Sequence, residues 1–210
     1  MEIKYHNPVL LDRSIEDLVD SPEGIYVDVT FGGGGHSRKI LKSLSKNGKL
    51  IAFDQDQDAI KNTLSDPRFE LIQANFKYLK QYLKFHGIKK VDGILADFGV
   101  SSHQFDTEQR GFSTRFKGRL DMRMDQEASL SAYEVVNSYS EKELISILKL
   151  YGEVKGAHKI ASTIIEYREN QKIETTTELI ELITPLIPER FLNKILAQVF
   201  QAIRIEVNQE

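Results

Sequence analysis

Short apolar runs alternate with amphipathic segments along the first half of the chain. The apolar runs predict strands over 25–31, 49–53, 69–73 and 91–96. The segments between them predict helices over 8–20, 36–46, 58–66 and 78–86. No two-residue hairpin signal joins the runs, so the alternation predicts an α/β fold with a parallel, doubly wound sheet. In such sheets ligands bind at the carboxyl ends of the strands.

The second half has a different pattern. Residues 99–128 are rich in Gly, Ser, Arg and Asp and lack periodicity, which predicts a long loop of the kind that is often functional. From residue 131 the apolar spacing is helical, and no strand signal occurs up to residue 200. Three capping boxes predict helix starts there: Ser131 with Glu134, Ser140 with Glu143, and Thr175 with Glu178. We therefore expect an all-helical module after the sheet.

Four consecutive glycines, Gly32 to Gly35, separate the first strand from the next helix. Glycine permits positive φ and close approach of a ligand, and a helix N-terminus favours anions. A dinucleotide fingerprint needs glycines at the first, third and sixth positions, and a P-loop needs Gly-Lys-Ser/Thr. His36 and Ser37 follow here, so neither register fits. An acid before the turn, Asp28, and one after the second strand, Asp54, favour a ligand with a ribose and a charged amino-acid tail, such as S-adenosylmethionine.

Polar or aromatic residues follow each predicted strand and are candidates for the binding site. Asp54 is a candidate acceptor for ribose hydroxyls, although a capping role is the alternative. Phe76 is a candidate to flank adenine, and a core role is equally consistent with its position. His36 opens a helix beside the predicted ligand or is simply an exposed histidine. Asp97 ends the fourth strand, where it could hold an incoming amine in line for methyl transfer or cap the following turn.

The long loop carries five cations against one acid over residues 110–123. Cationic side chains contact phosphates and aromatic rings stack on splayed bases, so this segment is a candidate RNA-binding surface. A solvated charged loop is the commoner outcome of such a run. The candidate RNA-binding residues are Arg110, Arg115, Lys117, Arg119 and Arg123, with Phe112 and Phe116 interleaved.

Composition removes several classes of protein. The chain has 210 residues, no cysteine and five scattered histidines, so we expect no disulfide and no metal site. The formal net charge of −3 gives no global attraction to nucleic acid, so an RNA partner would need a local basic patch. The N-terminus lacks an apolar signal core and no run reaches the length of a membrane span. We therefore expect a cytoplasmic protein without a membrane partner.

Several long motifs resemble the bacterial 16S ribosomal RNA cytosine-N4-methyltransferase family. They lie at 6–11, 31–37, 92–102, 110–113, 120–124 and 200–208, and together they span nearly the whole chain. The resemblance implies a Rossmann-like class I methyltransferase sheet with an inserted all-helical module. It also implies S-adenosylmethionine-dependent methylation of N4 of a cytidine in the decoding region of 16S rRNA, with the small ribosomal subunit as partner.

Carried over by position, the resemblance also assigns domains and cofactor contacts. It divides the chain into a methyltransferase core, 1–104 and 201–210, and a basic loop with a helical insertion, 105–200. The implied cofactor-binding residues are Gly34, Gly35, His36, Asp54, Phe76, Asp97 and Gln104. Asp97 as the catalytic amine acceptor is a hypothesis from the residues, because the resemblance supplies no settled catalytic base.

One departure from the family pattern concerns the C-terminal strands. The family continues beyond the 204–208 segment into further core strands, whereas this sequence stops at Glu210. We therefore expect a sheet that is incomplete at its C-terminal strands, with an open apolar edge that favours homodimers or other self-association. Two alternatives to the rRNA enzyme stay open: a non-catalytic, truncated fragment that binds cofactor or RNA, and an amino-methyltransferase that acts on DNA.

Overall fold

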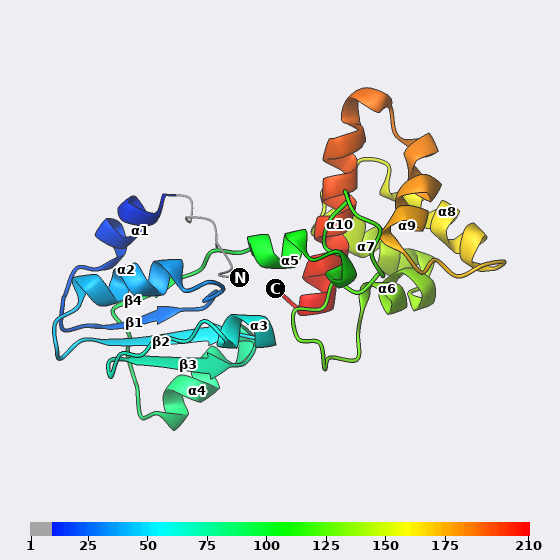
Figure 1. The fold of residues 1–210 in the computed structure, drawn as a ribbon. Helices are drawn as coiled ribbons and strands as arrows, with labels where there is room; N and C mark the ends of the chain where they lie inside the picture. The colour runs from blue at the N-terminus through cyan, green and yellow to red at the C-terminus, as the bar shows by residue number, and fades with distance from the viewer. Residues whose placement is uncertain (1–9) are drawn as a thin grey trace. The chain divides into compact units, whose positions relative to one another are not determined.

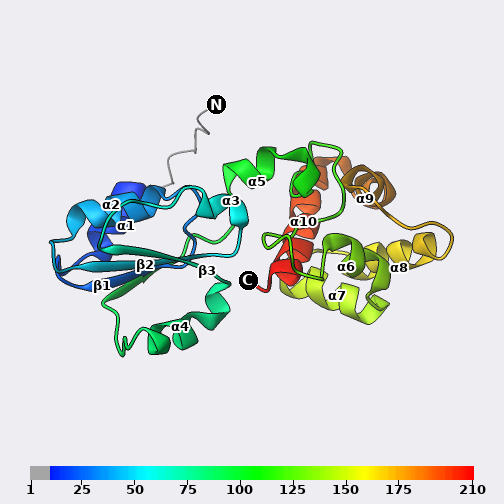
Figure 2. The same cartoon turned by 60° about the horizontal axis from the view of Figure 1, so that its bottom comes forward.

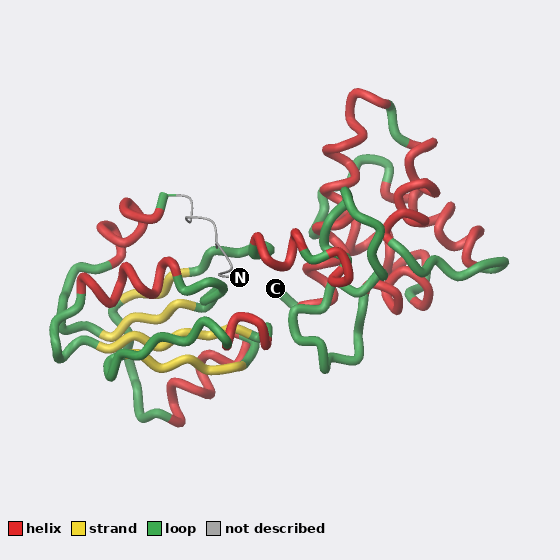
Figure 3. The backbone as a smooth tube through the Cα atoms, in the orientation of Figure 1, coloured by secondary structure: helices red, strands yellow, loops and turns green. Residues whose placement is uncertain are grey.

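A computed structural model describes residues 10–210 of the chain. The chain divides into two compact units, with the boundary between Ser101 and Ser102. Figure 1 traces both units, and Figure 3 colours the strands yellow and the helices red. Residues 6–9 of the first family motif, and the predicted start of the first helix at residue 8, lie outside the described residues.

The first unit is built around a four-stranded parallel sheet in the order β3-β2-β1-β4. Its strands are β1 (Ile25–Asp28), β2 (Lys49–Asp54), β3 (Phe69–Gln73) and β4 (Gly93–Leu95). Its helices are α1 (Leu11–Leu18), α2 (Gly35–Ser43), α3 (Gln57–Ile60), the 3-10 turn η1 (Phe76–Tyr78) and α4 (Leu79–Phe85). The predicted α/β fold with a Rossmann-like parallel sheet is confirmed.

The sheet is buried on both faces, and its central strands are apolar over 25–27 in β1 and 50–53 in β2. Tyr26 and Leu50 face α1 and α2, whereas Val27 and Ile51 face the side covered by α4. The register pairs Tyr26 with Leu50 and Val27 with Ile51, so equivalent side chains line up across the strands. Figures 1 and 2 show α1 and α2 on one face of this sheet and α4 on the other. This two-sided burial explains why the strands read as continuous apolar runs rather than alternating ones.

Several predicted boundaries in the first unit were too long. The first strand was predicted to reach residue 31 but ends at Asp28, because the Asp28 carboxylate accepts the Thr30 N–H at 3.1 Å and turns the chain. The third helix covers only Gln57–Ile60 and is capped by Asp56 rather than started by Asp58. Leu10 is the N-cap of the first helix, with φ 57° and no side-chain hydrogen bond.

The second unit is helical. It contains α5 (Ser102–Asp106), η2 (Glu108–Arg110), α6 (Ala132–Ser138), α7 (Glu141–Leu150), α8 (Ala157–Arg168), α9 (Thr176–Ile183), η3 (Thr184–Leu186), η4 (Glu189–Phe191) and α10 (Leu192–Asn208). All three predicted capping boxes are present, at the starts of α6, α7 and α9. Leu144, Ile164 and Val199 are among the fully buried residues where these helices pack together.

Two features of the second unit differ from the sequence prediction. The segment 99–128 was predicted to be a long loop but contains α5 and η2. Residues 201–208, which were assigned to the methyltransferase core, form the C-terminal half of α10 and pack with α6 and α7, so they lie in the helical unit. The apolar residues Ala202, Ile203 and Val207 explain this, because they lie on the buried stripe of a continuous helix.

None of the helices within residues 10–210 is long and apolar enough to cross a lipid bilayer.

Candidate functional site

The carboxyl ends of four neighbouring strands bring the candidate residues to one edge of the first unit. Asp28 ends β1, Asp54 ends β2, Asn75 follows β3 and Asp97 follows β4. Parallel strands place these ends side by side, which is where ligands bind in this class of sheet. Gly32 to His36 begin at the same edge, after β1.

Asp54 ties the end of β2 to the glycine turn. Its Oδ2 accepts the Gly32 N–H at 2.7 Å, and its Oδ1 accepts the Asp56 N–H at 2.9 Å. Burial raises the pKa of Asp54 to about 6, and these two hydrogen bonds hold it below the value that burial alone would give. A carboxylate has about four lone-pair sites, so Asp54 keeps capacity for further donors.

The glycine turn is shaped so that its outer side is open and its inner side is packed. Gly32 and Gly34 have positive φ values of 51° and 74°. A Cβ added at Gly34 would lie 2.9 Å from the Phe31 Cζ, whereas one at Gly32 would meet nothing within 4 Å. Gly34 is also the N-cap of α2, and no side chain caps that helix. The first N–H groups of α2 are therefore not capped by a side chain, which is an arrangement that suits an anion.

Two hydroxyl groups that sequence reasoning did not include in the site, those of Thr30 and Ser37, hold this edge together with Asp28. Asp28 is fully buried and accepts the Ser37 hydroxyl at 2.7 Å, which connects β1 to the first turn of α2. Burial raises the pKa of Asp28 above its ordinary value. The Thr30 Oγ1 accepts the Asp97 N–H at 2.8 Å and joins the ends of β1 and β4. The signal that could have found them is an acid at a strand end followed by hydroxyl residues within one turn.

His36 and Asp97 lie together beside a small cavity. His36 is buried, and its Nδ1 is 4.0 Å from the Asp97 Oδ2, whose side chain is 63% exposed. A cavity of about 270 Å³ lies next to them, lined by Ser14, Leu18, His36 and residues 94–97. The structure thus brings two of the predicted residues together, with one carboxylate accessible from solvent.

Phe76 follows β3 and touches a second aromatic ring. Its ring centroid lies 5.4 Å from that of Phe98, which is 61% exposed. The neighbouring Asn75 donates from its Nδ2 to the Gln55 Oε1 at 3.0 Å, which connects the loops after β2 and β3. An aromatic face and amide groups next to Asp54 are suited to a purine ring.

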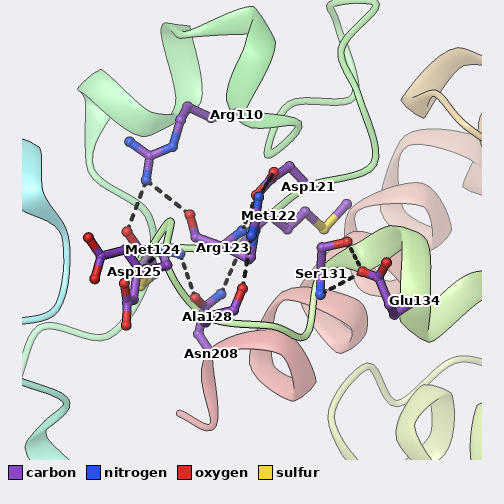
Figure 4. A network of polar contacts seen from close by, with 11 residues as sticks. Arg110, Asp121, Met122, Arg123, Met124, Asp125, Ala128, Ser131, Glu134 and Asn208 are labelled. Carbon is purple, nitrogen blue, oxygen red and sulfur yellow. Dashed lines mark hydrogen bonds and ion pairs between the residues drawn. The ribbon is translucent and has the colours of Figure 1, made fainter.

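The remaining predicted cofactor residue, Gln104, lies in α5 of the second unit, where it is buried. The five predicted RNA-binding cations, also in that unit, fall into two groups. Arg115, Lys117 and Arg119 are exposed. Arg110 and Arg123 make internal contacts instead (Figure 4).

Arg110 and Arg123 stabilise the segment 120–124. Arg110 is only 6% exposed, and its Nη2 donates to the carbonyls of Arg123 at 3.0 Å and Met124 at 3.3 Å. Arg123 donates to both carboxylate oxygens of Asp121 at 3.0 and 2.7 Å, and also to the Ala128 carbonyl at 2.8 Å. The Asp121 carboxylate raises the pKa of the Arg123 guanidinium. Sequence reasoning missed this because the partners of Arg110 are backbone carbonyls.

Asn208 bridges the same segment to the end of α10. Its Oδ1 accepts the Met124 N–H at 2.7 Å, and its Nδ2 donates to the Met122 carbonyl at 2.8 Å (Figure 4). Met122 has a φ of 57°, so the chain turns tightly between the two bonds. The motifs 120–124 and 200–208, which are far apart in the sequence, are therefore in direct contact.

Comparison with known protein families identifies one model, described as the MraW methylase family, that matches residues 3–210. The chain belongs to this family. Three curated relatives are named Ribosomal RNA small subunit methyltransferase H. The relative from Flavobacterium johnsoniae is 60% identical over 208 residues, and that from Christiangramia forsetii is 59% identical over 208 residues. Each of these alignments covers 99% of this chain and 69% of the relative.

The third relative, from Bacteroides fragilis, is 54% identical over 209 residues, which cover 100% of this chain and 69% of the relative. Membership in the MraW methylase family confirms the resemblance inferred from the motifs. The site residues carried over from that resemblance stay predictions, because the comparisons identify the family and not the role of each side chain.

Proposed function

We propose that this protein transfers a methyl group from S-adenosylmethionine to N4 of a cytidine in the decoding region of 16S rRNA, the RNA of the small ribosomal subunit. The observation that carries the proposal is the Asp54–Gly32 bond at the carboxyl edge of the sheet in a member of a methylase family. The small-subunit rRNA target rests on the name of the relatives, Ribosomal RNA small subunit methyltransferase H.

The residues at the sheet edge fit S-adenosylmethionine. Asp54 has lone pairs available for ribose hydroxyls in addition to its two backbone bonds. The uncapped N-terminus of α2 and the buried His36 suit the carboxylate of an amino-acid tail. Phe76 offers a ring face to adenine. When bound, S-adenosylmethionine supplies a methyl group that is already activated by its sulfonium.

The protein's own contribution to the reaction is then mainly positioning. Asp97 accepts an N–H of the cytidine amine and fixes its orientation. The Thr30 hydroxyl oxygen accepts the Asp97 backbone N–H and fixes the backbone at this position, and the His36 imidazole lies 4.0 Å from the Asp97 carboxylate. The base must leave its stack to reach this edge. Because the Asp97 side chain is 63% exposed, the proton that the methylated amine loses passes to water.

A methyl-transfer assay tests the proposal. Labelled S-adenosylmethionine is incubated with the protein and with protein-free 16S rRNA, isolated small ribosomal subunits or duplex DNA, and the nucleosides are then identified by mass spectrometry. N4-methylcytidine recovered from RNA supports the proposal. Label found only in DNA, or in a different nucleoside, contradicts it. Tight cofactor binding by calorimetry without transfer to any substrate indicates a non-catalytic binding protein instead.

The role of Asp97 is tested separately by Asp97→Asn. The amide keeps the size of the side chain but weakens its capacity to accept the amine N–H. We expect kcat to fall by a factor of about 10² to 10⁴, in the range of a single positioned acceptor, with the cofactor Kd unchanged. Full turnover in this variant would remove Asp97 from the mechanism, and a loss of cofactor affinity alone would make it a binding residue.

A further inference from the structure

The three exposed cations of the second unit lie on one loop, residues 113–119, which we call the basic loop. Exposure alternates along it: Arg115, Lys117 and Arg119 are exposed, whereas Gly118 and the following Leu120 are buried. The alternation directs the three charges outward and the intervening residues inward.

The basic loop is held by the N-terminus of α9. The Thr176 hydroxyl donates to the Phe116 carbonyl at 2.7 Å and accepts the Gly118 N–H at 3.0 Å. The Thr176 N–H donates to the Gly118 carbonyl at 2.9 Å, and Arg119 forms an antiparallel bridge with Thr175. The loop is thus paired along its length with a well-ordered helix start.

Close backbone packing adds a second constraint. A Cβ at Gly118 would lie 2.0 Å from the Glu108 carbonyl oxygen, so only glycine fits there. The Arg115 guanidinium carbon lies 4.9 Å from the centre of the Phe105 ring, which supports that side chain by a cation–π contact. The charged groups are therefore presented from a preformed surface, and little conformational freedom is lost when they bind a ligand.

These cations are not neutralised within the protein. In the part of the chain from residue 10 onward, none of the three side chains forms an ion pair with Asp or Glu. The carbonyl oxygen of Glu108 packs against Gly118, and the carbonyl oxygen of Glu174 accepts the N–H of Leu120, next to the loop, at 2.9 Å. Arg110 and Arg123, by contrast, are used internally. Three unpaired cations on a rigid loop form a local basic surface on a chain of net charge −3.

We propose that the basic loop is a preorganised contact for the phosphate backbone of single-stranded RNA, made by Arg115, Lys117 and Arg119. The choice of RNA as ligand rests on the proposed function. The contact itself is electrostatic and sequence-independent, so it holds the substrate strand without reading its bases. Arg110 and Arg123 take no part in it.

The salt dependence of binding tests this proposal. The affinity of a fluorescein-labelled single-stranded oligoribonucleotide is measured by anisotropy over a series of KCl concentrations. Each phosphate contact contributes about −0.7 to the slope of log K against log[salt] for single strands. The triple variant R115Q/K117Q/R119Q is therefore expected to lose about 2 from the magnitude of the slope. An unchanged slope overturns the proposal.

A matched control separates the loop from general charge. The triple variant K149Q/K155Q/K159Q removes three exposed lysines from the same unit, and it is expected to keep the slope of the wild-type protein. An equal loss of slope in this control overturns the proposal, because RNA would then respond to net charge alone. Circular dichroism melting of both triple variants verifies that each stays folded.

Thr176→Val tests the preorganisation. It removes the hydroxyl that holds the loop but keeps all three charges, so the expected result is weaker RNA binding with an unchanged salt slope. Unaltered affinity in a folded Thr176→Val protein overturns the claim of a preformed surface.

Because the assay needs no methyl transfer, RNA binding through this loop without any methylation would refute the proposed function and leave this inference intact. Normal rRNA methylation, together with an unchanged RNA salt slope in the triple variant R115Q/K117Q/R119Q, would refute this inference and leave the proposed function intact.

Discussion

Replacing Asn208 by alanine is expected to destabilise the helical unit substantially. The substitution removes the bond from the Met124 N–H at 2.7 Å and the bond to the Met122 carbonyl at 2.8 Å, both in a buried setting. It also removes the bond from Nδ2 to the Arg204 carbonyl at 2.9 Å. Asn208 itself is 5% exposed, so water has little access to the groups that lose their partner.

The magnitude follows from the two long-range bonds. Losing one partner of a buried hydrogen bond costs about 1–3 kcal/mol. Two such bonds give an expected loss of roughly 3 kcal/mol in the free energy of unfolding, after allowance for relaxation around the small cavity. For a chain of this size, a loss of 1 kcal/mol lowers Tm by about 2–4 °C, so we expect a decrease of about 6–12 °C.

Circular dichroism in the helical band, followed during heating and during urea titration, measures the effect. Asn170→Ala is the control, because that side chain is exposed, and it is expected to change stability by about 0.5 kcal/mol or less. If Asn208→Ala melted within about 2 °C of the wild-type protein, with the control also unchanged, the bridge between α10 and the 120–124 segment would contribute nothing and the reasoning would be wrong.

Asn208→Asp provides a sharper comparison. It keeps an acceptor for the Met124 N–H but replaces the donor to Met122 by a carboxylate oxygen, which repels that carbonyl. We expect this variant to be at least as unstable as Asn208→Ala near neutral pH. It should recover part of its stability in acid, where the protonated carboxyl can donate again. Equal stability of wild type and Asn208→Asp at neutral pH would refute the donor role.

Three further predictions concern other parts of the molecule. Because the pKa of Asp54 is about 6 and hydroxyl donors favour its ionised form, the affinity for S-adenosylhomocysteine should rise between about pH 5 and 7 and level off above pH 7. Calorimetry over this pH range measures the affinity, and Asp54→Asn should lose the pH dependence. Because the pKa of Asp54 is higher in the folded protein than in the unfolded chain, the contribution of Asp54 to the free energy of unfolding should decrease as the pH rises through about 6. Arg110→Lys ends one bond short of the Arg110 Nη2 that donates to the Arg123 and Met124 carbonyls, so it should lower the free energy of unfolding by about 1–2 kcal/mol. The RNA salt slope should stay unchanged, and a smaller slope would show that Arg110 contacts RNA. Ile94 on the edge strand β4 is 49% exposed, so sedimentation should reveal concentration-dependent self-association that Ile94→Lys abolishes, whereas a monomer at every concentration contradicts the prediction.

The sequence was sufficient where the deciding interactions are local. The capping boxes at Ser131, Ser140 and Thr175 were predicted correctly, because each depends on a side chain three residues away. The β3 strand was predicted with its observed limits, 69–73, because Asp66-Pro67 before it and Asn75 after it interrupt the chain on both sides. Asp54 was placed correctly at a strand end for the same kind of reason.

The sequence was insufficient where a side chain is satisfied by a distant backbone group. Arg110 was predicted to bind RNA, but its partners are carbonyls 13 and 14 residues away. Asn208 was recognised only as part of a family motif, since its contacts with Met122 and Met124 span 86 and 84 residues. Backbone carbonyls and N–H groups occur at nearly every position, so no pattern of residue types identifies which of them a buried side chain will use.

The bridge made by Asn208 has a consequence for the order of events during synthesis. The sheet unit lies within the first 101 residues and can begin to fold while the ribosome is still adding the rest. The 120–124 segment must wait for a partner that is made 84 residues after Met124. Closing so long a loop is slow relative to forming the individual helices. The nascent chain therefore passes through a stage in which the sheet has formed and the helical half is still open to chaperones and proteases.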